Sequence, residues 1–339
     1  MLYTAAVVLV TGACVAGWWA YWPRYRLAQA EKAVAAGDWA RADELLQPLA
    51  REEPPQLRPQ VLLARALRHL GRADEAEPLL FKASRLGMAE ADFRRELALT
   101  RATRGFTPAV EHHLAACLKE KPDDAEVVQA LAEGYTATRR WEDADRCYTC
   151  WHELQPERTD VLMGRGRMRL EAGSGHHVGR VANAAADFKE VLRHDPSDYD
   201  ARLSLAHCLT ADARMREAKE HLQICRTQRP DRLEPLVGLA ACALEERDWD
   251  EADRLLREAL KIDPASTYVL MMRGDLELRR QRFEDAITFF RKVLGEEPRN
   301  KAACLKLAQA LRGAGRTAEA DERMRVYQGL GDEQEAGPR

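Results

Sequence analysis

Residues 233–266 read LEPLVGLAACALEERDWDEADRLLREALKIDPAS, and residues 267–300 read TYVLMMRGDLELRRQRFEDAITFFRKVLGEEPRN. Both 34-residue segments have a small residue at position 8, an alanine at position 20 and a proline at position 32, namely Ala240 and Gly274, Ala252 and Ala286, Pro264 and Pro298. Small residues at fixed places on two helices allow the helices to pack closely. The pattern therefore predicts a repeated pair of antiparallel helices.

The same frame extends over most of the chain. Its prolines recur at Pro122, Pro156, Pro196, Pro230, Pro264 and Pro298, with one gap of 40 residues among gaps of 34. Position 8 is small throughout: Ala30, Ala64, Ala98, Ala132, Gly166, Ala206, Ala240, Gly274 and Ala308. We therefore expect eight to nine repeats, over residues 23–56, 57–90, 91–124, 125–158, 159–198, 199–232, 233–266, 267–300 and 301–327, and a disordered tail over 328–339.

This frame resembles the tetratricopeptide-repeat family, whose unit is a 34-residue helix-turn-helix. The turn Gly37-Asp38-Trp39 and the helix start Asp143-Ala144 also fit that family. The resemblance implies an all-α fold, a right-handed α-solenoid whose concave face binds other proteins. The plan is also similar to the lipopolysaccharide assembly protein B type, which has an N-terminal anchor, but this sequence has no rubredoxin-like zinc module with paired cysteine motifs.

In the family, positions 2, 5, 9, 12 and 13 of the first helix line the binding groove. Carried onto this sequence, these positions predict a partner-binding groove lined by Arg58, Val61, Arg65, Arg68, His69, Arg95, Met163, Arg167, Leu170, Leu203, His207, Val237, Leu244, Met271 and Leu278. The basic residues come first and the apolar ones follow, which suits a peptide with acidic residues at one end. Burial between neighbouring helices explains the apolar residues equally well.

The N-terminal segment predicts a membrane anchor. No charged residue occurs from Leu2 to Trp22, and about 20 apolar residues suffice to cross a bilayer. Aromatic residues end the run, and Arg24 and Arg26 follow it, as at a membrane interface. We therefore expect a transmembrane helix over residues 1–22, with the repeats in the cytoplasm. A cleaved secretory signal and repeats facing the periplasm are the alternatives.

The composition indicates which class of ligand and which compartment to expect. The chain has 52 basic and 55 acidic residues and a net charge of -3, so we expect no nucleic-acid ligand. The repeat frame assigns core positions to Cys117, Cys225, Cys208 and Cys242, and unpaired core cysteines suit a reducing compartment.

Chemistry-bearing motifs are weak. The pair Cys147 and Cys150 lies inside a predicted helix without a second pair, and the loop over residues 172–180 lacks a complete phosphate-binding motif. No set of nucleophile, base and orienting residue can be assembled. We therefore expect a non-enzymatic membrane scaffold, without cofactor, metal or small-molecule substrate, that assembles or regulates a membrane or cell-envelope complex. A periplasm-facing assembly factor and a regulatory subunit of a separate enzyme are the alternatives.

Overall fold

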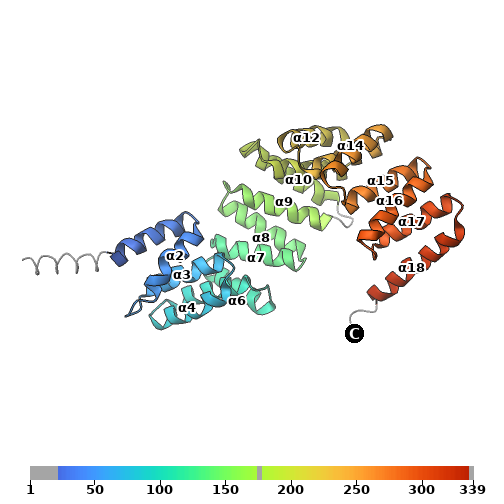
Figure 1. The fold of residues 1–339 in the computed structure, drawn as a ribbon. Helices are drawn as coiled ribbons and strands as arrows, with labels where there is room; N and C mark the ends of the chain where they lie inside the picture. The colour runs from blue at the N-terminus through green and yellow to red at the C-terminus, as the bar shows by residue number, and fades with distance from the viewer. Residues whose placement is uncertain (1–21, 174–177, 336–339) are drawn as a thin grey trace, which may run out of the picture. The chain divides into compact units, whose positions relative to one another are not determined.

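A computed structural model of the chain describes residues 22–173 and 178–335, and every regular element in these ranges is a helix (Figure 1). The all-helical repeat fold expected from the sequence is confirmed. The chain forms two compact blocks, an N-terminal block (Met1–Met168) and a C-terminal block (Arg169–Arg339). The predicted anchor over residues 1–22 lies outside the described residues, apart from Trp22. Among the helices that are described, none is long and apolar enough to cross a membrane.

The helices follow one another as antiparallel hairpins. In the N-terminal block a helix over residues 22–35 is followed by α2 (Trp39–Ala50), α3 (Leu57–His69), α4 (Ala73–Arg85), α5 (Glu90–Ala102), α6 (Pro108–Glu120), α7 (Ala125–Ala137) and α8 (Trp141–Leu154). The boundary between the blocks falls within α9 (Thr159–Gly173). The C-terminal block continues with α10 (Val178–His194), α11 (Tyr199–Ala211), α12 (Met215–Gln228), α13 (Leu233–Glu245), α14 (Trp249–Ile262), α15 (Thr267–Arg279), α16 (Phe283–Glu296), α17 (Lys301–Gly313) and α18 (Thr317–Glu335).

The turn inside most hairpins uses a left-handed residue at position 15. The residues with this backbone are Gly37, Gly71, Arg139, Ala213, Arg247, Gln281 and Gly315. In each case the next amide donates to a carbonyl five residues back, as Arg214 N does to Leu209 O at 2.8 Å. This is the Schellman pattern, which satisfies the carbonyls left free at a helix end. The chain can therefore reverse within three residues.

The second helix of several repeats ends just before the recurring proline. In α8, α12, α14 and α16 the last helical residue comes two positions before that proline, as Ile262 does before Pro264. Proline restricts the residue that precedes it to extended conformations, so the helix cannot continue. Asp263 accordingly has φ -133° and ψ 95°. The proline thus sets the helix boundary.

The small residues at positions 8 and 20 form the core of the hairpins. At position 8, Ala30, Ala132, Ala206 and Ala240 are fully buried, and at position 20 the same holds for Ala42, Ala76, Ala144, Ala184, Ala218, Ala252, Ala286 and Ala320. Larger side chains fill the space around these contacts, among them Phe188 and Phe290. The close packing that the sequence predicts is therefore present in both blocks.

The fifth repeat and the C-terminal end both differ from the regular frame. The extra residues of the fifth repeat mostly lengthen its helices, because α9 has 15 residues and α10 has 17, where α11 has 13 and α12 has 14. The core of the predicted loop, residues 174–177, lies outside the described residues. At the C-terminus the structure continues α18 to Glu335, so residues 328–335 of the expected disordered tail are helical. No proline interrupts this stretch, and its glutamine, leucine and glutamate residues favour helix, whereas Gly329 and Gly331 oppose it.

Candidate partner-binding surface

The first helices of neighbouring hairpins lie beside one another. In the N-terminal block α3 contacts α5, and α5 contacts α7. In the C-terminal block α11 contacts α13, and α15 contacts α17. We call the surface that these first helices form the inner face of each block. All the predicted groove residues belong to first helices, so the predicted groove corresponds to the inner faces.

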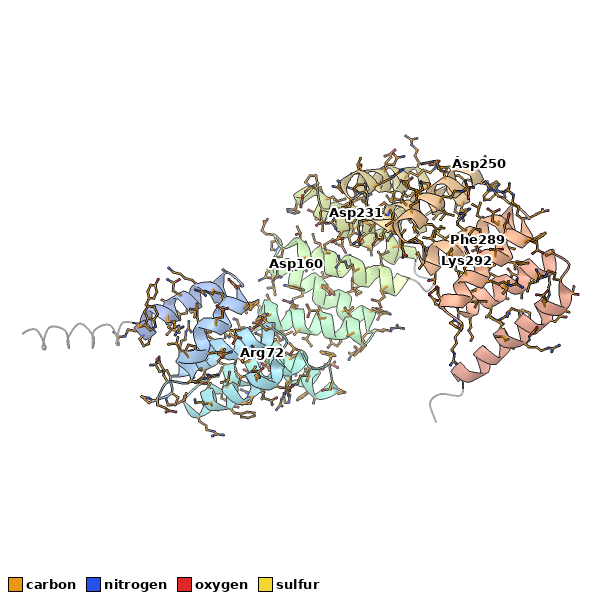
Figure 2. All side chains as sticks on the ribbon, in the orientation of Figure 1. Arg72, Asp160, Asp231, Asp250, Phe289 and Lys292 are labelled. Atoms are coloured by element: carbon orange, nitrogen blue, oxygen red, sulfur yellow. The ribbon has the colours of Figure 1, made fainter. Side chains whose placement is uncertain are left out.

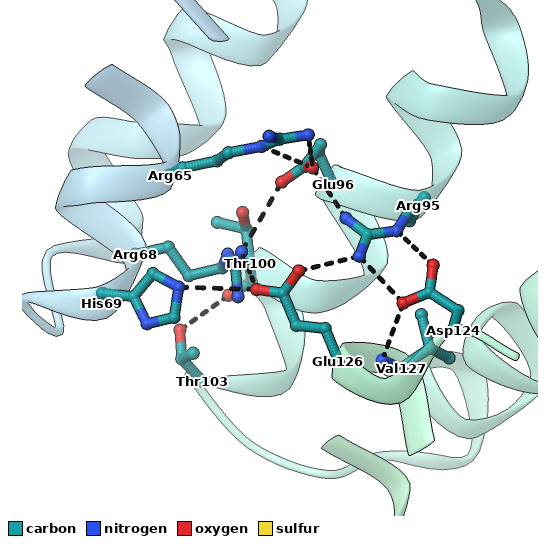
Figure 3. Close-up of polar contacts among 10 residues, drawn as sticks. All are labelled: Arg65, Arg68, His69, Arg95, Glu96, Thr100, Thr103, Asp124, Glu126 and Val127. Atoms are coloured by element: carbon teal, nitrogen blue, oxygen red, sulfur yellow. Dashed lines mark hydrogen bonds and ion pairs between the residues drawn. The ribbon is translucent and has the colours of Figure 1, made fainter. Parts of the chain in front are cut away.

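A network of ion pairs covers the inner face of the N-terminal block (Figure 3). It joins three arginines, Arg65, Arg68 and Arg95, to three carboxylates, Glu96, Asp124 and Glu126. Nε of Arg95 lies 2.5 Å from Oδ2 of Asp124, and Nη2 lies 2.9 Å from Oδ1 of the same carboxylate. The formal charges of these six residues cancel.

The network is largely removed from solvent. Arg68 is 6% exposed, Glu96 is 1% exposed and Asp124 is 5% exposed. Burial alone raises the pKa of Glu126, but the hydrogen bond from His69 and the charge of Arg68 outweigh it and hold the pKa well below its usual value. The pKa of Asp124 is lowered in the same way, because Arg95 outweighs the cost of burial. Both carboxylates therefore stay ionised across the neutral range.

This network corrects one expectation from the sequence. Arg65, Arg68 and Arg95 were expected to form a basic entrance to the groove, but their charge is balanced by carboxylates of the same block. Arg58 pairs with Glu31 at 2.9 Å. The N-terminal inner face is therefore not a free basic surface, and its arginines hold neighbouring hairpins together.

A pocket of about 470 Å³ opens beside the network. Arg68 and His69 of α3 form one wall, and Leu99 of α5 and Glu126 of α7 lie across from them. The ring of His69 also stacks on Trp39, with centroids 3.9 Å apart and planes 6° apart. Two neighbouring first helices, α5 and α7, and the C-terminal end of a third, α3, thus form one pocket.

The pocket depends on an unusual connection in the third repeat. Residues 103–107 join α5 to α6, whereas three residues join α3 to α4 and α7 to α8. From this longer connection Phe106 reaches α7, where its ring lies edge-on to Tyr135, with centroids 5.2 Å apart. Gly134 leaves the space for that ring, since a Cβ there would lie 2.0 Å from Phe106 Cδ2.

The inner face of the C-terminal block is more apolar. Leu203 of α11, Val237 of α13 and Met271 of α15 occupy the same repeat position and are each half-buried, while His207 is exposed. Although the His207 side chain is exposed, the protein packed around its ring partly removes it from water and lowers its pKa, and the nearby Glu234 partly opposes that shift. The three apolar side chains thus lie in a row that is only partly covered by the fold.

The other predicted groove residues vary in exposure. Met163 and Leu244 are buried, Val61, Leu170 and Leu278 are half-buried, and Arg167 is exposed. Met271 and Leu278 pack against the core cluster that contains Phe290. Burial between helices, the alternative explanation for the apolar positions, therefore accounts for part of the set.

The cysteines lie mostly in the core. Cys208, Cys225 and Cys242 are buried, as expected, while Cys117 is only partly buried because its position in α6 is less closely covered. All seven cysteines in the described residues are free, including Cys147 and Cys150 on α8. Within residues 22–173 and 178–335, no group of three His, Cys, Asp or Glu side chains is arranged to hold a metal ion.

Sequence reasoning missed Phe106 and Glu133. Phe106 lies in the third repeat, where the regular turn is replaced, and Gly105 and Pro108 on either side of it signalled an altered connection. Glu133 occupies position 9 of the fourth repeat, a groove position, and is exposed. Both residues line the pocket.

Stacked helical hairpins with a shared inner face define this chain as a helical-repeat protein. Two sequence profiles described as "Tetratricopeptide repeat" match it, one over residues 33–95, 177–224 and 277–330, the other over residues 238–302. The chain contains tetratricopeptide repeats.

Several known proteins are similar to parts of the chain. Anaphase-promoting complex subunit 7 from Mus musculus is 28% identical over 129 residues, and so is its Homo sapiens counterpart; each match covers 38% of this chain and 23% of the relative. The chain therefore matches less than a quarter of the length of these relatives. A crystal structure of MamA has 18% identity and a TM-score of 0.43, covering 47% of this chain and 92% of that one. A tetratricopeptide repeat protein from Parabacteroides merdae has 16% identity and a TM-score of 0.46, covering 85% and 98%.

Proposed function

We propose that this chain is a membrane-anchored scaffold that binds other proteins through the inner faces of its repeats. It collects partners for the assembly or regulation of a membrane or cell-envelope complex and performs no catalysis itself. Repeat solenoids use an extended face of first helices for this purpose. The partner surface differs between such proteins, so the argument depends on this chain's own residues.

The observation that carries the proposal is the apolar row on the C-terminal inner face. Leu203, Val237 and Met271 come from three successive first helices and remain half-buried. A protein segment that lies along this face buries apolar area, which contributes roughly 25 cal/mol per Å². Anchors at regular spacing suit an extended or helical segment.

The start of the first described helix supports the membrane anchor. Trp22 and Tyr25 are 43% and 45% exposed, and their rings stack with centroids 6.1 Å apart. Tryptophan and tyrosine with adjacent arginines are typical of a membrane–water interface, and Arg24 and Arg26 supply the charges. The aromatic and basic residues of a membrane interface thus stand where the apolar segment over residues 1–22 ends and the first repeat begins.

Co-purification tests the scaffold. The full chain is extracted from its membranes in mild detergent, and the proteins bound to it are compared between variants. We expect Val237→Glu and Met271→Glu to lose partners that the unchanged chain retains, because a charge on the apolar row opposes burial. Ile224→Glu is the matched control, since Ile224 is 42% exposed on the second helix α12. Loss of the same partners in all three variants, or in none, contradicts the proposal.

Thiol labelling tests the topology. We propose that the repeats face the cytoplasm, on the side where free cysteines such as Cys208 and Cys242 remain reduced. A cysteine placed at Gly337 is treated in intact cells with a membrane-impermeant reagent. Protection until the inner membrane is opened supports a cytoplasmic location. Labelling in cells with only the outer membrane permeabilised assigns the repeats to the periplasm.

A further inference from the structure

The pocket under the connection of residues 103–107 differs in charge from what the sequence suggests. Arg104 at its edge pairs with Glu77 at 2.6 Å and also with Asp74. Arg68 pairs with Glu126 at 2.5 Å. The basic groups that line the pocket therefore already have carboxylate partners, and they offer little net attraction to an acidic ligand.

Glu133 is the exception among these charges. It lies on α7 at the pocket and is exposed. Its Oε1 accepts a hydrogen bond from Nε2 of Gln129 at 2.8 Å. Within residues 22–173 and 178–335, no arginine, lysine or histidine forms an ion pair with it. Its charge helps to raise the pKa of Arg158, but within the described ranges Glu133 remains the pocket carboxylate without a direct ion pair.

The wall next to Glu133 is partly apolar. Phe106, Ala130 and Ala137 line the pocket next to Glu133, and Leu99 lies at its base with 2% exposure. Lysine and arginine side chains bury their methylene stems along such surfaces while their charged ends stay near water. An aromatic face such as that of Phe106 also attracts a cation. The apolar wall and the carboxylate thus complement the two parts of a long basic side chain.

One buried donor beside the pocket lacks an acceptor in the described part of the chain. Arg68 lines the pocket and is 6% exposed, yet its Nε has no hydrogen-bond acceptor among the described residues. Leaving a buried donor unsatisfied costs about 1–3 kcal/mol. A volume of about 470 Å³ is enough for a basic side chain and its flanking backbone.

We propose that this pocket binds a partner protein segment that carries a lysine or arginine, with the stem of that side chain on Phe106, Ala130 and Ala137 and its charge at Glu133. The inference rests on the proposed function, because it assumes that the inner faces bind protein segments. It predicts that the N-terminal block binds a basic segment, whereas the sequence predicted an acidic one.

A peptide library tests this inference. The purified full chain in detergent micelles is used to select peptides from a random displayed library, and individual peptides are then titrated by fluorescence anisotropy. During the selection an excess of the soluble Ala137→Trp variant competes for the peptides, so that peptides binding outside the pocket are removed. Among the peptides that stay bound to the unchanged chain, we expect enrichment of lysine and arginine. Ala137 is exposed and lines the pocket, so a tryptophan there occupies the space without disturbing the core.

Three variants give the quantitative result. Glu133→Gln keeps the size and the hydrogen-bonding capacity of the side chain, and we expect it to weaken a selected basic peptide about fivefold. Ala137→Trp should weaken the same peptide about tenfold or more. Glu220→Gln is the matched control, because the Glu220 side chain is 64% exposed on the second helix α12 and not on an inner face; it should leave the affinity within about twofold.

The outcomes separate the two proposals. Peptides that are bound equally by the unchanged chain and by the Glu133→Gln and Ala137→Trp variants contradict the pocket inference and leave the scaffold function intact. Enrichment of acidic peptides in place of basic ones also overturns it. A failure to enrich any peptide contradicts both the inference and the proposed function. Circular dichroism of each variant checks that the helices are retained.

Discussion

Phe106 lies directly over Gly134, and a Cβ at residue 134 would come within 2.0 Å of the ring. A glycine inside α7 costs helix stability, roughly 1 kcal/mol relative to alanine. Its presence is therefore explained by this contact, because only a glycine lets the ring approach the helix. The relationship ties the altered third repeat to the shape of the pocket.

Gly134→Ala should destabilise the protein even though alanine favours helix. The added methyl collides with Phe106, and overpacking of this kind costs about 1–3 kcal/mol. Urea unfolding followed by circular dichroism measures the change. In the Phe106→Ala background the same substitution should cost much less, since the collision is gone. Gly295→Ala on α16 is the control, because nothing lies within 4 Å of a Cβ there. Equal effects at the two glycines would rule out the packing explanation.

Arg95→Met should be among the most damaging single changes on the N-terminal inner face. It removes the arginine paired with Asp124 and leaves that buried carboxylate without its ion-pair partner, which costs about 3–5 kcal/mol. Arg58→Met is the comparison, since the Arg58 side chain is 66% exposed and its pair with Glu31 is worth less than about 1 kcal/mol. Thermal unfolding of both variants checks the ranking, and a similar melting temperature for the two would contradict it.

The N-terminal block should lose stability in acid. The pKa values of Asp124 and Glu126 are lower in the folded chain than in the unfolded chain. Their contribution is therefore complete above the unfolded values and is lost as the pH falls through the folded ones. Urea midpoints from pH 7 to pH 3 measure this dependence. Glu126→Gln should flatten it, whereas Glu52→Gln, outside the ion-pair network, should not. A Glu126→Gln curve parallel to that of the unchanged chain would exclude this carboxylate as a source.

Ala213→Gly should stabilise the C-terminal block. Ala213 has φ 57°, where a side chain is strained by about 1–2 kcal/mol and glycine is not. Glycine also gains flexibility in the unfolded chain, so the net gain should be below about 1 kcal/mol. Gly315→Ala, at φ 76° in the equivalent turn, is the reverse test and should destabilise the chain. Calorimetry measures both, and a loss of stability with Ala213→Gly would count against the turn analysis.

The regular parts of the fold could be predicted from single positions in the sequence. Ala252 and Ala286 mark helix contacts because no larger residue fits there, and Pro264 marks a helix end because of its backbone restriction. These constraints are local and repeat every 34 residues. The all-helical repeat fold could therefore be predicted without knowing how the hairpins stack.

The charge balance of the candidate site was harder to predict. The sequence predicts Arg95 as a groove residue without a partner. In the structure it pairs with Asp124 and Glu126, which come from the end of the third repeat and the start of the fourth. Position 5 of one repeat and position 2 of the next are neighbours only after stacking. Phe106 lay beyond prediction for another reason, since the five-residue connection breaks the frame that located the other residues.

Direct contact between the inner face and a partner is the central claim, and site-specific photo-crosslinking tests it most directly. A photoreactive amino acid replaces Val237 on α13 of the inner face or Ile224 on α12 in the full chain, and cells are irradiated before the membranes are purified. Figure 2 draws the side chains of the described residues. The account predicts crosslinked protein adducts at Val237, identified by mass spectrometry, and none of the same adducts at Ile224. Adducts of equal yield at both positions, or adducts only at Ile224, would contradict it.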